Sequence, residues 1–293
     1  MKKYSGNFIL TVIFICLFPQ QILSGGLSIK KLWETGGFKN PESVIYDEKN
    51  HVLYLSNVNG SAVEKDGNGF ISKVSPGGRV LELEWVSGLN APKGLAVYNN
   101  KLYTADIDAL VEIDIPTAMI TNIYRVDDAR FLNDVTVDQD GKVFVSDMMM
   151  NRIHCLENGK FNIWLESPEL ENPNGLLVEG DSIILGSWGV MKDGFATDIP
   201  GHLKSISLDD KVVKSIGDGQ PVGNLDGVES DQHGNYYVTD WMAGKLLHID
   251  NNGNFKVLLS LEQGMADHEF ITGETLFLIP MMKSNKLLAY KLQ

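Results

Sequence analysis

One segment design recurs six times along the 293-residue chain and constrains the fold more than any other feature. Each copy reads as a short strand, a turn rich in Asn, Asp and Gly, and a second strand of β-branched or aromatic residues, the pattern of a β-hairpin. The copies begin at Pro41, Pro92, Leu132, Pro173, Leu225 and Ala266. Their second residues are spaced 51, 40, 41, 52 and 41 positions apart. A period near 40 residues suits four-stranded propeller blades.

The fold predicted from this period is an all-β, six-bladed β-propeller formed by residues 27–293 as one domain. Further strands follow most of the hairpins, and no helical period competes with the strand pattern. The last repeat supplies three strands, near 269–271, 275–279 and 286–292, and the chain then ends one strand short. Residues 28–35 resemble the outer strands of other repeats, so we expect them to complete the sixth blade and close the ring.

The first 26 residues have the pattern of a secretory signal peptide. Lys2 and Lys3 are followed by the apolar run 8–18, which is too short to span a membrane, and by small residues up to Gly26. We therefore expect a periplasmic or secreted protein. Because the segment contains two lysines and no acid, its removal would change the formal charge from −13 to −15. Such a charge disfavours nucleic acid and anionic membranes as partners, and the oligomeric state stays open.

The second residues of the six repeats are predicted to form a ring at one mouth of the central channel. They are Glu42, Lys93, Asn133, Asn174, Asp226 and Asp267. Four of them, namely Glu42, Asn133, Asn174 and Asp226, offer two carboxylates and two amide oxygens. Hard oxygen donors of this kind suit Ca²⁺ or a similar divalent cation, whereas zinc would want histidine or thiolate ligands. Taken singly, each of these residues could equally be an ordinary turn or capping residue.

A second, apolar ring is predicted at the same mouth, where the second strand of each blade ends. It consists of Val58, Ile107, Met148, Trp188, Trp241 and Met281. We expect Met148, Trp188, Trp241 and Met281 to hold the organic part of a small-molecule substrate. Lys93 would either neutralise Asp267 or contact an anionic substrate. Asp106, Asp147 and Asp240, which precede the apolar ring, are expected to cap turns or to form hydrogen bonds between blades.

The chain resembles the senescence-marker-protein/gluconolactonase family of six-bladed propellers, and more distantly the paraoxonases and diisopropylfluorophosphatase. The stretches that carry the resemblance are P-E-S-V at Glu42, L-N-D-V at Asn133, P-N-G-L at Asn174 and L-D-G-V at Asp226. They match the family's quartet of divalent-metal ligands in order and in blade. The resemblance implies a lactone- or ester-opening hydrolase. Arg130 stands three residues before Asn133, whereas gluconolactonase-like members carry an arginine two residues before it, which argues against a sugar lactone.

A metal-dependent lactonase would need a general base beside the cation. Asp226 is the first candidate for this role, and Asp267 is the second. Arg130 and Lys93 are candidates for binding the substrate. Two other functions stay open: a non-enzymatic propeller that binds a small ligand or a partner around a structural metal, and a hydrolase of another substrate class or a metal-free enzyme on the same fold.

Overall fold

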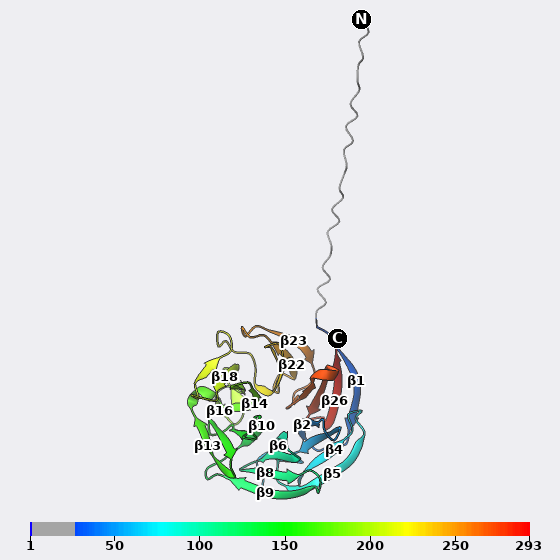
Figure 1. Ribbon diagram of the computed structural model, residues 1–293, viewed down its shortest axis with the longest axis vertical. Coiled ribbons are helices and arrows are strands. Elements are labelled where there is room, and N and C mark those ends of the chain that lie inside the picture. The colour runs from blue at the N-terminus through cyan, green and yellow to red at the C-terminus, as the bar shows by residue number, and fades with distance from the viewer. Residues whose placement is uncertain (2–26) are drawn as a thin grey trace.

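The computed structural model describes residue 1 and residues 27–293, which form a closed ring of six four-stranded antiparallel sheets around a central channel (Figure 1). The predicted six-bladed propeller is therefore confirmed. The signal peptide predicted for residues 1–26 lies almost entirely outside the described residues. Over residues 27–293 the chain has two short 3-10 helices, η1 (Pro168–Leu170) and η2 (Thr272–Glu274), and no helix there is long and apolar enough to cross a membrane.

Each blade runs outward from the channel, and its first two strands correspond to one sequence repeat. The innermost strands are β2 (Pro41–Asp47), β6 (Pro92–Tyr98), β10 (Leu132–Val137), β14 (Pro173–Glu179), β20 (Leu225–Ser230) and β24 (Glu269–Ile271). The second strands are β3 (Val52–Asn57), β7 (Lys101–Asp106), β11 (Val143–Asp147), β15 (Ser182–Ser187), β21 (Tyr236–Asp240) and β25 (Leu276–Met281).

The outer half of each blade comes from the segments between the repeats. The third strands are β4 (Gly69–Val74), β8 (Ala109–Asp114), β12 (Arg152–Glu157), β18 (Leu203–Ser207), β22 (Lys245–Ile249) and β26 (Lys286–Leu292). The outermost strands are β5 (Val80–Leu89), β9 (Met119–Arg125), β13 (Lys160–Glu166), β19 (Val213–Ser215), β23 (Phe255–Ser260) and β1 (Ile29–Gly36). A small extra hairpin, β16 (Met191–Asp193) and β17 (Ala196–Thr197), projects from the fourth blade.

The two ends of the chain close the ring as predicted. Strand β1 pairs antiparallel with β26, from Ile29 opposite Leu292 to Gly36 opposite Lys286, and so becomes the outer strand of the sixth blade. Ser28 and Gln293 exchange backbone hydrogen bonds beyond the last pair. Figure 1 shows the blue and red ends of the chain side by side. Pairing the last blade with the first strand leaves no open position between the sixth blade and the first.

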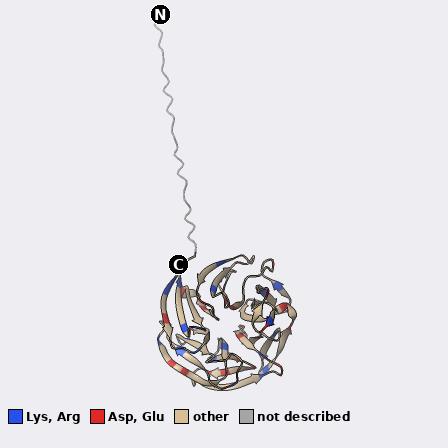
Figure 2. Cartoon of the chain, turned by 180° about the vertical axis from the view of Figure 1, so that it is seen from behind, with Lys and Arg blue, Asp and Glu red and all other residues tan. Residues whose placement is uncertain are grey.

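Hydrophobic clusters fill the space between neighbouring blades. Leu53 and Leu55 of β3, for example, are fully buried against residues of β25 and β26, and Leu102 and Ile113 of the second blade pack against the first. The clusters are built from the inward-facing residues of the β-branched and aromatic strands that the repeat pattern identified. Residues with charge of both signs occur around the whole ring (Figure 2).

Close approach of the innermost strands requires glycine at particular positions. A Cβ atom built on Gly175 of β14 would lie 1.8 Å from the backbone carbonyl oxygen of Asp226 in β20. Backbone cannot move aside as a flexible side chain can, so this contact fixes how near Asn174 and Asp226 come to each other.

Gly175→Ala should therefore lower the free energy of unfolding by at least about 3 kcal/mol, because relief of the overlap would have to separate two blades. Urea unfolding followed by tryptophan fluorescence measures the change. Gly273→Ala is the matched control, because a Cβ there meets nothing within 4 Å and its backbone is not in the left-handed region. Equal stabilities for the two variants would show that the two strands can separate at little cost.

Candidate functional site

A cavity of about 240 Å³ lies at the channel mouth where the innermost strands begin. Five of the six residues predicted for the inner ring line it: Glu42, Lys93, Asn133, Asn174 and Asp226. All five are buried, and they come from five consecutive blades. Three residues of the predicted apolar ring, namely Met148, Trp188 and Trp241, line the same cavity. The structure therefore brings together side chains that are far apart in the sequence, such as Glu42 and Trp241.

Three of the oxygen-bearing side chains are joined by hydrogen bonds across blade boundaries. The Asn174 amide nitrogen donates to Asp226 Oδ1 and to the backbone carbonyl of Leu225, both at 3.0 Å. The Asn133 amide nitrogen in turn donates to Asn174 Oδ1. These bonds hold the ends of the three side chains together from the third, fourth and fifth blades.

Two oxygen atoms at the cavity have no hydrogen-bond donor among the described residues. They are Glu42 Oε2 and Asn133 Oδ1, and both are buried. A buried oxygen acceptor without a donor or a cation is costly. Among residues 27–293 no three His, Cys, Asp or Glu side chains gather as a metal cluster, so a cation here would depend on the amide oxygens as well as on Glu42 and Asp226. A flip of a side-chain amide exchanges the positions of its oxygen and nitrogen atoms, so both asparagines can present an oxygen to a cation. The donor set fits a hard divalent cation.

Burial perturbs the ionisable groups at this cavity. Burial, and then the neighbouring Asp226 and Asp267, raise the pKa of Glu42 well above its ordinary value. Burial and Asp267 likewise raise the pKa of the Asp226 carboxyl. Two carboxylates in this space repel each other and are poorly solvated, and a bound positive charge would relieve both effects.

The Lys93 ammonium group places a positive charge of the chain itself at the cavity. Its side chain is 2% exposed, and its Nζ donates to the carbonyl of Ala91 at 3.0 Å and lies 4.6 Å from the centroid of the Phe131 ring. Burial lowers the pKa of Lys93 to about 8, against the opposing influence of Glu42 and then Asp106. Of the carboxylates, Glu42 and then Asp106 act on the charge of Lys93, and Asp267, the partner that the repeat pattern suggests, is not among them.

The sixth blade departs from the predicted alignment by one residue. In the third, fourth and fifth blades the residue that directly follows the second strand donates its backbone N–H to a carbonyl. That carbonyl belongs to the residue two positions before the ring residue, as in the bond from Trp188 to Asn172. In the sixth blade the corresponding bond runs from Met282 to Gly264. The ring position is therefore Ala266 rather than Asp267, and the residue of the apolar ring is Met282 rather than Met281. Met282 lines the cavity, while Met281 is buried in the core beside it.

Asp267 faces a different cavity, of about 550 Å³, which lies toward the other ends of the innermost strands. Asp267 Oδ2 accepts a hydrogen bond from Ser43 Oγ at 2.6 Å. Glu229, Glu269 and the buried His268 also line this space, and neither ring nitrogen of His268 has a partner among the described residues. Burial raises the pKa of Asp267 and of Glu269 to about 7, and it lowers the pKa of His268 to about 3.

The raised pKa of Asp267 predicts a pH-dependent stability. The folded protein binds this proton more tightly than the unfolded chain, whose carboxyl titrates near 3.8. The stabilising contribution is therefore complete below about pH 4 and is lost as the pH rises to about 7. Asp267→Asn cannot lose a proton, so from pH 4 to pH 8 it should gain about 1 to 2 kcal/mol relative to the parent protein. Urea unfolding in the presence of a chelator measures this. Parallel stability curves for the two proteins would contradict a raised pKa for this half-buried carboxyl.

Besides Met282, three residues that line the first cavity were not predicted. Phe131 precedes the third repeat, Ala62 lies in the loop 58–68, and Phe195 lies in the turn of the β16–β17 hairpin. The loop and the hairpin belong to the first and fourth blades, and these are the two repeats with spacings of 51 and 52 residues instead of about 40. The extra length of those two spacings is the feature of the sequence that indicates additional residues over the mouth of the channel.

Arg130 does not line the cavity. Its side chain is exposed, and its backbone N–H donates to Asp147 Oδ2 at 3.0 Å. Asp147 accepts a second backbone bond from Phe131, and Asp106 accepts bonds from Asn90 and Ala91 in the same way. These aspartates cap turns, as predicted, and the Asp147 turn positions Phe131 rather than the Arg130 side chain at the cavity.

Comparisons with known proteins agree with this architecture. The SMP-30/Gluconolactonase/LRE-like region matches residues 40–262. A gluconolactonase of Xanthomonas campestris superposes with a TM-score of 0.67 at 14% identity, covering 92% of this chain and 90% of that one. A virginiamycin B lyase of Staphylococcus aureus reaches a TM-score of 0.62 at 14% identity, covering 92% and 100%. At such identities the structural likeness concerns the fold alone. No curated protein matches the chain at a significant level.

Proposed function

The chain belongs to the SMP-30/gluconolactonase/LRE-like family, and from this premise we propose that it is a divalent-cation-dependent hydrolase of lactones or related esters. The observation that carries the proposal is the meeting of Glu42, Asn133, Asn174 and Asp226 at one buried cavity, where two of their oxygen atoms have no hydrogen-bond donor within residues 27–293. Buried polar atoms in a purely structural core are normally hydrogen-bonded, so these two oxygen atoms favour a bound ligand over a structural role.

In this proposal Glu42, Asn133, Asn174 and Asp226 hold the cation, and calcium is the ion that their hard oxygen atoms suit best. When bound, the cation supplies Lewis-acid polarisation of the ester carbonyl and stabilisation of the developing oxyanion. The chain's own contribution is to hold four donors from four blades around one point before the substrate arrives.

Asp226 is the proposed general base. Its Oδ1 already accepts a hydrogen bond from Asn174, so Oδ2 is the atom left to take a proton from the attacking water. The hydroxyl adds to the carbonyl carbon, the bond from that carbon to the ring oxygen breaks, and the proton passes to the departing oxygen. The carboxylic acid that forms then loses its proton to solvent, and Lys93 is proposed to bind the resulting carboxylate. Met148, Trp188 and Trp241 exclude bulk water from the reacting atoms.

A hydrolysis panel tests the proposal. We expect the purified protein, supplied with calcium, to acidify weakly buffered solutions of at least one γ-lactone, δ-lactone or aryl ester at a rate well above the protein-free rate. Titration at constant pH measures the acid released. Absence of hydrolysis across the whole panel, with calcium shown to be bound, would favour a binding propeller over an enzyme.

A further inference from the structure

We infer that the cavity takes a small apolar lactone, with an alkyl or aryl substituent, and that it discriminates against lactones carrying several hydroxyl groups. This inference rests on the proposed function, because it names the substrate class of the same site. It assigns the discrimination to an aromatic wall formed by Phe131, Trp188, Phe195 and Trp241.

The first argument concerns hydrogen-bond partners. Apart from the four oxygen-bearing side chains, the polar side-chain groups of the described residues that line the cavity are the Lys93 ammonium and the indole N–H groups of Trp188 and Trp241, which are donors only. The indole N–H of Trp188 is already used, since it donates to the carbonyl of Phe195 at 2.9 Å. A polyhydroxylated lactone would bury several hydroxyl groups against carbon atoms and leave them without partners, which is costly for each group.

The second argument concerns shape. The Phe195 ring lies edge-on to Phe131, with centroids 5.4 Å apart, and edge-on to Trp188, with centroids 6.2 Å apart. Trp188 and Trp241 are also 6.2 Å apart. Aromatic rings at these spacings form a continuous apolar surface with defined geometry. A planar or chain-like apolar substituent can lie against such a surface while its ester group faces the quartet.

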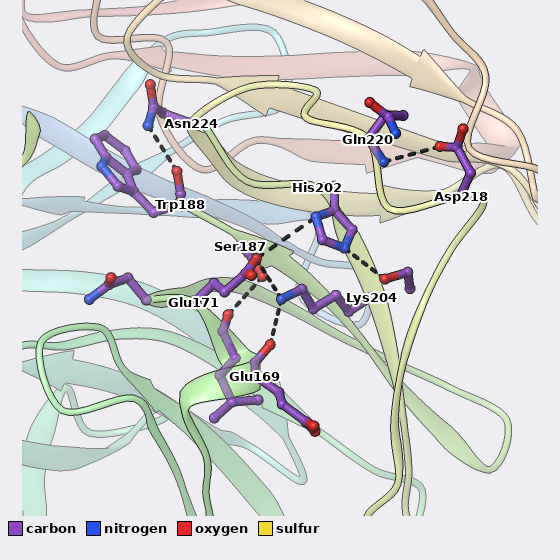
Figure 3. Close-up of polar contacts among 12 residues, drawn as sticks. Glu169, Glu171, Ser187, Trp188, His202, Lys204, Asp218, Gln220 and Asn224 are labelled. Carbon is purple, nitrogen blue, oxygen red and sulfur yellow. Dashed lines mark hydrogen bonds and ion pairs between the residues drawn. The ribbon is translucent and has the colours of Figure 1, made fainter. Parts of the chain in front are cut away.

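The third argument is that the hairpin carrying Phe195 is anchored at its base. The Asn224 side-chain amide donates to the carbonyl of Trp188 at 2.8 Å and to Thr197 Oγ1 at 3.0 Å, and the backbone of Met191 donates to Asn172 Oδ1 at 2.9 Å. Figure 3 shows the Asn224 bond to Trp188 above the buried Lys204 and its contact with Glu171. Phe195 is thus held in place before a substrate binds.

The loop 58–68 limits the cavity from the opposite side. The first and fourth blades face each other across a six-bladed ring, and Ala62 of the first blade packs against the cluster of Phe131, Met148 and Trp188. A methyl group at this position closes the space without offering a hydrogen bond. We call the loop 58–68 and the β16–β17 hairpin the roof of the cavity. Size and polarity therefore act together, because the roof leaves room for a compact substrate and surrounds it with carbon atoms.

The test compares two six-membered lactones, dihydrocoumarin, which is apolar, and glucono-δ-lactone, which carries four hydroxyl groups. We expect kcat/KM to be at least about 100-fold higher for dihydrocoumarin. Phe195→Ser should lower that ratio by about tenfold, by reducing kcat/KM for dihydrocoumarin. Phe255→Ser is the matched control, because Phe255 is similarly exposed, at 48% against 39%, but lies on the outer strand β23. The control should keep the parent ratio.

A binding measurement separates this inference from the proposed function. The lactam analogue of dihydrocoumarin resists hydrolysis, and isothermal titration calorimetry should show that it binds at least about tenfold more tightly than gluconolactam, with the preference weakened in Phe195→Ser. Preferential lactam binding by a protein that hydrolyses no lactone would support the inference and overturn the proposed function. Hydrolysis of glucono-δ-lactone at a kcat/KM equal to or above that of dihydrocoumarin would overturn the inference and support the function. Failure of the parent protein to prefer the apolar lactam would overturn the inference as well.

Discussion

Replacing Asp226 with asparagine should lower kcat for lactone hydrolysis by about 1000-fold or more. The amide can still bond to Asn174 and offer an oxygen to a cation, so the site keeps its shape. It cannot accept a proton from water, and it removes one of the two negative charges of the quartet. Loss of general-base catalysis alone is worth about 100-fold to 10,000-fold, and weaker cation binding adds to it. Steady-state kinetics on the best substrate of the panel measures the change.

Glu229→Gln is the control for this prediction, because it removes a carboxyl from the other cavity while leaving the quartet intact. We expect its kcat to stay within a few-fold of the parent value. Circular dichroism should show the same strand content for both variants. Full activity of Asp226→Asn would mean that another group takes the proton, and comparable losses in both variants would point to general electrostatics instead of a base at Asp226.

The fold and most of the residues that line the cavity were predictable from the repeats. The reason is that the pairing register of the first two strands in a propeller blade follows from the local sequence of the hairpin. Glu42, Asn133, Asn174 and Asp226 occupy the same position in four hairpins, and the closed ring carries this equivalence into space. In the sixth blade the same alignment failed. Asp267 resembles the other ring residues in type, but the backbone bond from Met282 to Gly264 sets the register one residue earlier. Residue identity alone does not reveal where a strand pair begins.

The roof of the cavity was not predictable in the same way. The spacing of the repeats shows that the first and fourth blades contain about ten extra residues, but no periodic pattern says where such a loop packs. Phe195 reaches the cavity because Trp188, Asn172 and Asn224 anchor its hairpin, and these contacts depend on three-dimensional neighbours. Arg130 shows the converse, since an Asp147 turn cap directs the adjacent Phe131 inward instead.

Removal of divalent cations with a chelator should abolish hydrolysis and lower the melting temperature, and added calcium should restore both. Without a cation, the buried carboxyl groups of Glu42 and Asp226 repel each other and Glu42 Oε2 has no partner among the described residues.

A ligand that binds only the folded protein stabilises it by about 2.7 kcal/mol at 100 times its Kd and about 4.1 kcal/mol at 1,000 times its Kd. In a domain of this size that corresponds to a shift of about 5 to 15 °C. Differential scanning calorimetry, with elemental analysis of the same samples, measures it. The double variant Glu42→Gln, Asn133→Ala loses the negative charge of one ligand and the oxygen of another, so its melting temperature should not respond to calcium. A parent protein that melts at the same temperature with and without chelator, and that contains no divalent metal when purified, would mean that the four donors do not form a cation site.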